Sequence, residues 1–65
     1  MQAWGPGEIK ELRKKLKLSQ KAFGSLIGVT GNYVYLLERG GKGPSNTLRL
    51  LMDCIERERE RERKV

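Results

Sequence analysis

The sequence predicts a compact all-α domain, and three features of the chain support this prediction. Apolar residues recur at helical spacing in four separate segments. Hydroxyl side chains that can cap the start of a helix precede three of these segments, at Ser19, Thr30 and Ser45. Glycines stand where two helices should end, at Gly28 and Gly40, because glycine adopts the left-handed conformation of a helix terminus without steric cost. The 65 residues suffice for one small domain.

The first helix is expected to begin at Pro6, because proline is favoured at the first helical position. Glu8 then lies in the first turn, where its charge complements the helix dipole. Residues at i, i+3 and i+7 should face the core: Ile9, Leu12 and Leu16. We expect residues 1–5 to form a flexible N-terminus, with Trp4 packed over the edge of the core. The domain proper then spans residues 6–55.

Residues 19–39 are predicted to form two short helices joined by a tight turn, which is the signature of a helix-turn-helix motif. The first of these helices has one apolar stripe, formed by Ala22, Phe23, Leu26 and Ile27. Val29 should fill the turn, and Val34 and Leu37 should face inward from the second helix, over residues 30–39. The second helix of such a motif can lie in the major groove of DNA.

A last helix is expected with Ser45 or Asn46 as its cap. Four apolar residues at helical spacing should close the core: Leu48, Leu51, Met52 and Ile55. Leu50 and Cys54 widen the apolar sector beyond what one core face requires, which favours a homodimer that buries them. We expect Cys54 to be a small buried hydrophobe rather than a reactive thiol, since only Arg57 is cationic beside it in the sequence.

Residues 56–65 form a charged extension in which glutamate and arginine alternate. Like charges fall at i and i+4, so the run gains little helical support. We expect a solvated continuation of the last helix, and the alternative is a tail that binds a partner or phosphates. The chain has a net charge of +6, of which this tail, with five basic and four acidic residues, carries +1. The remaining +5 on a small domain suits a polyanionic partner, nucleic acid first.

Several functional classes are disfavoured by what the chain lacks. It has no histidine, no paired carboxylates in a plausible cleft and no phosphate-loop motif, so we expect neither an enzyme nor a cofactor. Without histidine or a cysteine cluster we expect no metal site. No apolar run approaches the roughly 18 residues of a membrane span, and the first residues do not resemble a secretory signal. The single cysteine permits no internal disulfide, and we expect a cytoplasmic protein.

Residues characteristic of one family occur in register with these caps, turns and apolar positions: Leu12-Arg13, Leu18-Ser19-Gln20, Phe23, Gly28-Val29, Val34, Glu38-Arg39-Gly40 and Pro44-Ser45. Over roughly residues 8–55 the chain therefore resembles the Xre family, also called the Cro/CI-type helix-turn-helix. The resemblance implies a four- to five-helix, lambda-repressor-like fold and a double-stranded DNA partner. It also implies a transcriptional regulator, specifically a repressor of phage, plasmid or antitoxin type. Gly24 departs from the alanine usual in the family, and we expect glycine to fit at a cost of about 0.5–1 kcal/mol relative to alanine.

The resemblance also suggests roles for particular residues. It implies a structural ion pair between Arg13 and Glu38, which we keep apart from the DNA-contacting residues. We expect DNA phosphates to contact residues at helix starts and near the glycine-rich loop, where free N–H groups and cations are available: Ser19, Gln20, Lys21, Tyr33, Arg39 and Lys42. Base edges should face the outer residues of the helix over 30–39: Thr30, Gly31, Asn32, Tyr35 and Leu36.

These base-facing residues differ in what they can recognise. Asn32 is the best base reader, because asparagine pairs bidentately with adenine N6 and N7. Gly31 has no side chain to read with, and Leu36 can contact only a thymine methyl, whereas the family usually has long polar residues at both positions. The cluster of Tyr33, Tyr35 and Leu36 leaves an alternative open, which is a protein-interaction module that retains the helix-turn-helix fold.

Overall fold

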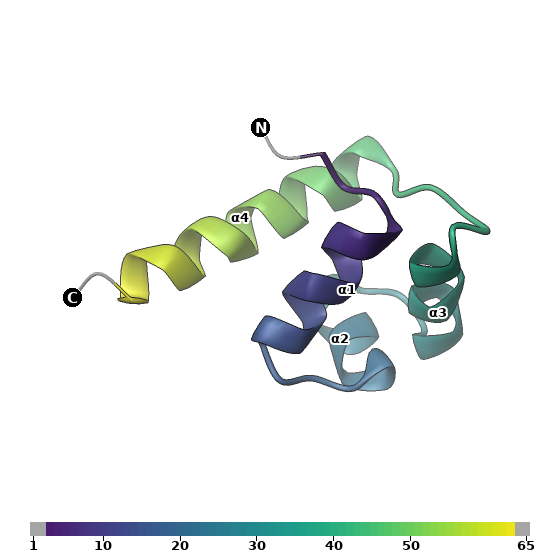
Figure 1. Ribbon diagram of the computed structural model, residues 1–65, viewed down its shortest axis with the longest axis horizontal. Helices are drawn as coiled ribbons and strands as arrows, with labels where there is room; N and C mark the ends of the chain where they lie inside the picture. The colour runs from purple at the N-terminus through teal and green to yellow at the C-terminus, as the bar shows by residue number, and fades with distance from the viewer. Residues whose placement is uncertain (1–2, 64–65) are drawn as a thin grey trace.

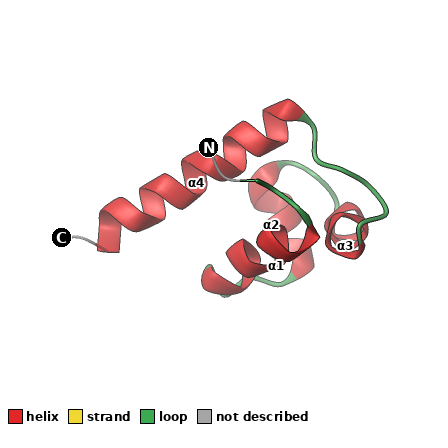
Figure 2. Cartoon of the chain, turned by 45° about the horizontal axis from the view of Figure 1, so that its top comes forward, coloured by secondary structure: helices red, strands yellow, loops and turns green. Residues whose placement is uncertain are grey.

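The computed structural model describes residues 3–63 and contains four helices in that range. They are α1 (Pro6–Lys15), α2 (Gln20–Ile27), α3 (Gly31–Arg39) and α4 (Asn46–Arg63). Helices α1–α3 form a compact body, and α4 crosses this body and continues well beyond it (Figures 1 and 2). The predicted all-α class is therefore confirmed in its four-helix form. No described helix is long and apolar enough to cross a membrane.

The predicted caps hold the three later helices. Ser19 Oγ accepts from the Ala22 N–H at 3.0 Å, and Thr30 Oγ1 accepts from the Tyr33 N–H at 3.1 Å. Ser45, rather than Asn46, caps α4, because its Oγ accepts from the Leu48 N–H at 3.2 Å. Each bond satisfies a backbone donor that has no partner within its own helix. At the other ends, α2 and α3 terminate at Gly28 and Gly40, which have φ angles of 80° and 84°.

α1 ends in a left-handed turn, although the sequence has no glycine at that position. The Leu18 N–H donates to Arg13 O at 3.2 Å and the Lys17 N–H donates to Lys14 O at 3.0 Å, which is the hydrogen-bond pattern of a Schellman motif. Lys17 occupies the left-handed position of this motif, with φ 59°. A residue with a Cβ is strained in that conformation by about 1–2 kcal/mol.

Replacing Lys17 by glycine should therefore raise the free energy of unfolding by about 0.5–1 kcal/mol, because the relief of strain exceeds the extra backbone entropy that glycine loses on folding. Urea denaturation measures this change. Lys14→Gly, inside α1, is the matched control and should lower the free energy of unfolding by about 1 kcal/mol. If both variants are destabilised equally, Lys17 is not strained.

Gly24 lies where α2 and the turn before α3 approach each other most closely. A Cβ at this position would be 2.6 Å from Val29 O and 2.9 Å from the Thr30 carbonyl carbon. Both neighbours are backbone atoms and cannot rotate away. The expectation that glycine merely fits here, at a cost relative to alanine, is therefore wrong, because in this structure the packing of the motif requires glycine.

Gly24→Ala should destabilise the domain by about 1–3 kcal/mol, because the added methyl forces the turn backbone to move. Gly7→Ala provides the control, since a Cβ on Gly7 would meet no atom within 4 Å. Alanine at that helical position should stabilise the domain by about 0.5–1 kcal/mol. Thermal denaturation of the two variants compares them, and a stabilised Gly24→Ala protein would contradict the close packing.

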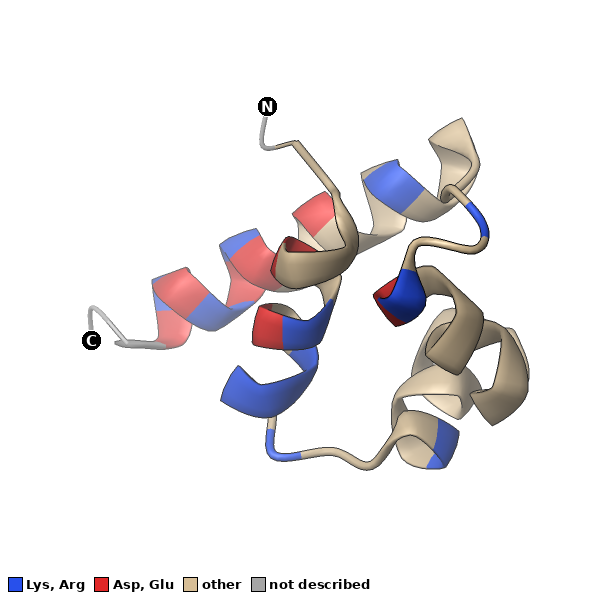
Figure 3. Cartoon of the chain, turned by 45° about the vertical axis from the view of Figure 1, so that its right-hand side comes forward, with Lys and Arg blue, Asp and Glu red and all other residues tan. Residues whose placement is uncertain are grey.

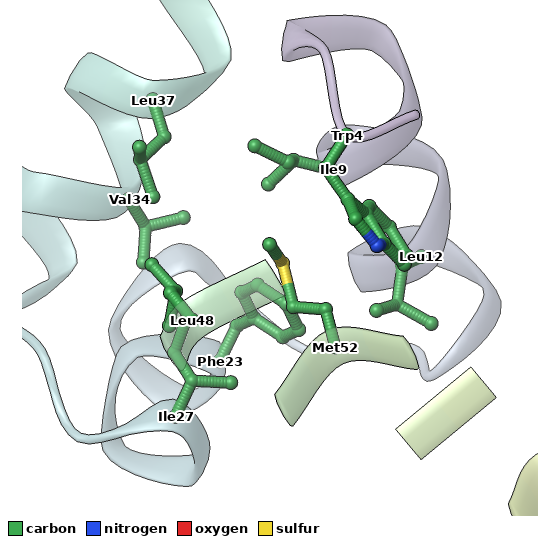
Figure 4. Packing of buried hydrophobic residues seen from close by; sticks show 9 residues of the cluster. All are labelled: Trp4, Ile9, Leu12, Phe23, Ile27, Val34, Leu37, Leu48 and Met52. Carbon is green, nitrogen blue, oxygen red and sulfur yellow. The ribbon is translucent and has the colours of Figure 1, made fainter. Parts of the chain in front are cut away.

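The core is a single cluster that all four helices and the N-terminal segment supply (Figure 4). Its members are Trp4, Ile9, Leu12, Phe23, Ile27, Val34, Leu37, Leu48 and Met52, with Leu16 and Ile55 packed against them. Three residues predicted to face it do not: Ala22, Leu26 and Leu51 are exposed. α2 is short and buries only a narrow arc around Phe23 and Ile27, so residues one position away on its apolar stripe remain in solvent.

Trp4 packs on the core as expected, and its side chain is only 6% exposed. Its indole Nε1–H donates to Asp53 Oδ1 at 2.8 Å, which ties the segment before α1 to the middle of α4. The end of α1 is also tied to α4, through the Lys15–Glu56 ion pair at 3.7 Å. The predicted boundary between a flexible N-terminus over residues 1–5 and the domain stays a prediction. Trp4 belongs to the packed part of the structure. Met1 and Gln2 lie outside the described residues.

Candidate nucleic-acid interface

The outer face of α3 presents three polar side chains in a row. Asn32, Tyr35 and Arg39 are spaced i, i+3 and i+7, so they lie on one side of the helix, and all three are exposed. Thr30, which caps the helix, is exposed at its start. Among the described residues no hydrogen bond engages the Asn32 side chain, so its amide is available to a ligand.

The two other residues predicted to face bases have packing roles. A Cβ on Gly31 would be 3.0 Å from Lys21 Cα and 3.2 Å from Lys21 N, so the first turn of α3 lies directly against the first turn of α2. Leu36 is half-buried, and its Cδ2 is directed at Gly41, whose N–H donates to Leu36 O at 2.9 Å. Neither residue contributes a hydrogen-bonding side chain to the outer face. At Gly31 the close approach of the Lys21 backbone leaves little room for a side chain, which accounts for the lack of a long polar residue there.

Tyr35 and Arg39 contact each other on this face. Arg39 Nη1 donates to Tyr35 Oη at 2.7 Å, and the guanidinium carbon lies 5.5 Å from the centroid of the tyrosine ring. The two contacts hold a cation at the C-terminal end of an otherwise uncharged helix face. Figure 3 shows that the other basic residues are spread over α1 and the link that follows it, the start of α2, the loop before α4 and α4 itself.

An ion pair between Arg13 of α1 and Glu38 of α3 holds these two helices together. Arg13 Nε and Nη2 donate to Glu38 Oε2 and Oε1 at 2.6 and 3.1 Å, and Arg13 Nη1 also donates to Leu18 O at 3.0 Å. The side chains of Arg13 and Glu38 are only 15% and 6% exposed. This is the pair that the resemblance implied, and the backbone contact at Leu18 extends it to the link before α2. The result is that α3 is oriented by a planar, bidentate interaction rather than by apolar contact alone.

Gln20 belongs to the same network. Its Nε2 donates to Glu38 Oε1 at 3.2 Å, which commits one of its two amide hydrogens to the ion pair. No described residue accepts from the second amide hydrogen, and the neighbouring Lys21 is exposed. The start of α2 is thereby held beside α3, with Ser19, Gln20 and Lys21 at the edge of its outer face.

The environment of Glu38 determines its protonation. Burial raises its pKa, but the hydrogen bonds from Arg13 and Gln20, together with the charges of Arg13 and Lys10, outweigh burial and hold the pKa below the usual value of 4.5. The ionised form is therefore favoured in the folded domain.

Acid should accordingly remove part of the stability of the domain. Because the folded pKa of Glu38 is lower than its unfolded value, its contribution is fully present above about pH 4.5 and is lost as the pH falls through the lower folded value. Melting temperatures of the wild type and Glu38→Gln, measured from neutral to strongly acid pH, test this. The gap between the two proteins should narrow in acid, and a gap that stays constant would mean that the charge on Glu38 does not stabilise the fold.

The loop between α3 and α4 adds one further cation. Lys42 is exposed in this loop, beside Gly41 and Gly43, and Arg39 precedes it at the end of α3. Four of the six predicted phosphate-contacting residues are exposed, namely Ser19, Lys21, Arg39 and Lys42, and Gln20 is half-buried. Tyr33, the sixth, is half-buried against the core.

α4 differs from expectation at Cys54 as well as at Leu51. Cys54 was predicted to be buried but is exposed, with Arg57 Nη2 at 3.8 Å from its sulfur. It lies one turn after Leu50, which is 54% exposed. The core-facing side of α4 is occupied by Leu48, Met52 and Ile55. Leu51 and Cys54 lie at its margins, where each lines a surface hollow together with residues of the body, and Leu50 is exposed.

Comparison with known proteins gives one match. A family model described as a helix-turn-helix matches residues 9–48, which is 40 of the 65 residues and runs from α1 to the first turn of α4. No curated protein and no solved structure matches the chain. The matched segment contains the whole of the α2–turn–α3 unit and both members of the ion pair behind it.

Proposed function

Because the chain belongs to the helix-turn-helix family of the Cro/CI (Xre) type, which implies DNA binding, we propose that it is a sequence-specific regulator of transcription that inserts α3 into the major groove of double-stranded DNA. The observation that carries the proposal is the exposed row of Asn32, Tyr35 and Arg39 on a helix held rigidly from behind. A rigid helix with accessible polar side chains is what direct reading of base edges requires.

Within this proposal, base reading depends mainly on Asn32. Its free amide can donate to adenine N7 and accept from adenine N6, and its place in the first turn suits contact with base edges. Gly31 and Leu36 supply no polar group. The few base contacts would be supplemented by the shape of the DNA and by backbone contacts, which make up half or more of protein–DNA hydrogen bonds.

Backbone contacts are assigned to the residues around α3. The start of α2, with Ser19, Gln20 and Lys21, offers free N–H groups and a cation to one phosphate. Lys42 in the glycine-rich loop and Tyr33 are the remaining candidates, and the basic excess of the chain favours all of these contacts. The finer assignment, a repressor of phage, plasmid or antitoxin type, follows from the resemblance of the motif.

The proposal also includes a homodimer of this protein. Leu50 and Cys54 form an exposed apolar stripe on α4, and a second copy would cover it. Dimers of helix-turn-helix domains read two half-sites about one turn of DNA apart. An inverted repeat is therefore the expected target.

The alternative, a protein-interaction module, relied on Tyr33, Tyr35 and Leu36 acting as one apolar patch. The structure separates these residues: Tyr33 packs on the core, Leu36 is directed at the following loop, and only Tyr35 is exposed, at 41%. The separated residues favour DNA binding over a docking role for α3.

The test is an equilibrium titration of the protein against mixed genomic duplex fragments at two salt concentrations, followed by sequencing of the recovered DNA. Enrichment of a short inverted repeat, with affinity that falls steeply as salt rises, is the expected result. Equal recovery of all fragments at low salt, lost entirely at moderate salt, would reject sequence-specific reading. The variant Tyr35→Ser/Leu36→Ser should lose DNA affinity, and it would keep that affinity if α3 bound a protein instead.

A further inference from the structure

The contact between Tyr35 and Arg39 has no evident structural purpose. Both side chains are exposed and neither belongs to the core. An exposed arginine ordinarily samples many rotamers, and holding it in one of them costs entropy. Here two interactions of different kinds act on the same guanidinium, a hydrogen bond of 2.7 Å and a stacking contact at 5.5 Å from the ring centroid.

We propose that Tyr35 is a positioning residue that presents the Arg39 guanidinium to one phosphate of the DNA backbone, and that the two side chains bind this phosphate together. The proposal rests on the DNA-binding function proposed above and adds a specific contact to it. Arg39 uses one of its five N–H donors on Tyr35, so the others remain available to phosphate oxygens. Tyr35 accepts from Arg39 through its oxygen, and its own hydroxyl proton remains free to donate to the same phosphate.

The position of the pair on α3 favours a phosphate over a base. Residues at the start of a recognition helix reach the base edges, and Arg39 is the last residue of α3, two turns after Asn32. The planar guanidinium fork matches a phosphate bidentately, which makes its orientation valuable.

The surrounding charges leave Arg39 available. The adjacent carboxylate, Glu38, is already bound by Arg13 and Gln20. No ion pair involves Arg39 within residues 3–63. Arg39 is therefore oriented by Tyr35 and has no acidic partner among the described residues, so its charge is available to an anion from outside the protein.

The experiment is a double-mutant cycle with Tyr35→Phe, Arg39→Gln and the double variant. Affinity for a pool of short random-sequence duplexes is measured over a series of salt concentrations, and melting temperature is recorded for each protein. Tyr35→Phe keeps the ring and removes only the hydroxyl. Arg61→Gln is the control, because Arg61 also bonds a neighbour on its own helix, Glu58 at 3.2 Å, but lies on the distal part of α4, away from α3 (Figure 1).

Arg39→Gln should reduce the steepness of the salt dependence by about 0.9 for each protomer, the value for one lost phosphate contact. Tyr35→Phe should weaken binding about three- to tenfold, which is the effect of one net hydrogen bond. Its effect should be clearly smaller once Arg39 is Gln, because only the direct bond from the Tyr35 hydroxyl to the phosphate is then left to lose. Arg39→Lys should keep the salt dependence and still lose affinity, because lysine keeps the charge without the planar fork. Melting temperatures should be unchanged, since both side chains are exposed.

Two results would overturn the proposal. If the wild type binds but the effects of Tyr35→Phe and Arg39→Gln are additive, or if Tyr35→Phe has no effect, then Tyr35 does not position Arg39, and DNA binding itself still stands. If the wild type shows no salt-dependent binding to duplexes at all, both this contact and the proposed function are rejected.

Discussion

Glu38→Ala is expected to lower the free energy of unfolding by up to about 3–5 kcal/mol, the upper end being the cost of leaving one partner of a fully buried ion pair without the other. Removing the carboxylate strands the Arg13 guanidinium, whose side chain is only 15% exposed, and it also deprives Gln20 of its acceptor. A typical domain has only about 5–15 kcal/mol of stability in total, so this loss is a large fraction of it and the variant should unfold at a much lower urea concentration than the wild type. Circular dichroism during urea denaturation measures the loss.

The control for this prediction is Glu58→Ala. Glu58 forms an ion pair with Arg61 at 3.2 Å, but these side chains are 68% and 78% exposed. Solvent screens such a pair, so its removal should cost no more than about 0.5 kcal/mol. Similar losses in the two variants would show that burial does not distinguish the Arg13–Glu38 pair from a surface contact.

Asn32→Ala is expected to have the largest effect on DNA recognition. If Asn32 pairs bidentately with adenine, its removal costs about 1–3 kcal/mol of discrimination at that base pair, and a dimer loses the contact at both half-sites. The free energy of unfolding should stay within about 0.5 kcal/mol of the wild type, because the side chain is exposed and no described residue hydrogen-bonds it. Competition binding against the enriched fragment and its single-base variants measures the effect.

The same substitution at Asn46 is the matched control. Asn46 is also exposed and also lies in the first turn of a helix, but its amide oxygen accepts from Arg49 at 3.4 Å on α4. Asn46→Ala should leave the preference among base pairs unchanged. If Asn32→Ala weakens binding to every sequence equally, Asn32 contacts the DNA backbone and the assignment of base reading to it is wrong.

The boundaries of the helices could be predicted from the sequence because they depend on local chemistry. The caps at Ser19 and Thr30 and the ends at Gly28 and Gly40 involve atoms within a few residues of each other in the chain, and all four appear in the structure. The Schellman motif at Lys17 is also local, but lysine carries no signal for a left-handed conformation, so it was missed.

Burial was harder to predict. Leu26, Leu51 and Cys54 fit apolar stripes, yet all are exposed. Periodicity shows which residues share a face of a helix, but the width of the buried part of that face depends on the neighbouring helices. These residues lie outside the core because α2 buries only a narrow arc of its surface and because α4, which crosses the body, packs only part of its apolar face against it.

The sequence by itself determined the fold class, the helix-turn-helix motif and the inward-facing residues of α3, Val34 and Leu37, since caps, glycines and apolar spacing are properties of short segments. Only the tertiary structure decided which residues of α3 are available. Gly31 lies against Lys21, Leu36 against Gly41, and Glu38 against Arg13, while Tyr35 holds Arg39. The reason is physical: whether a side chain is free to meet a ligand depends on what the rest of the chain places beside it, and that is fixed by packing between helices rather than by the spacing of residues within one.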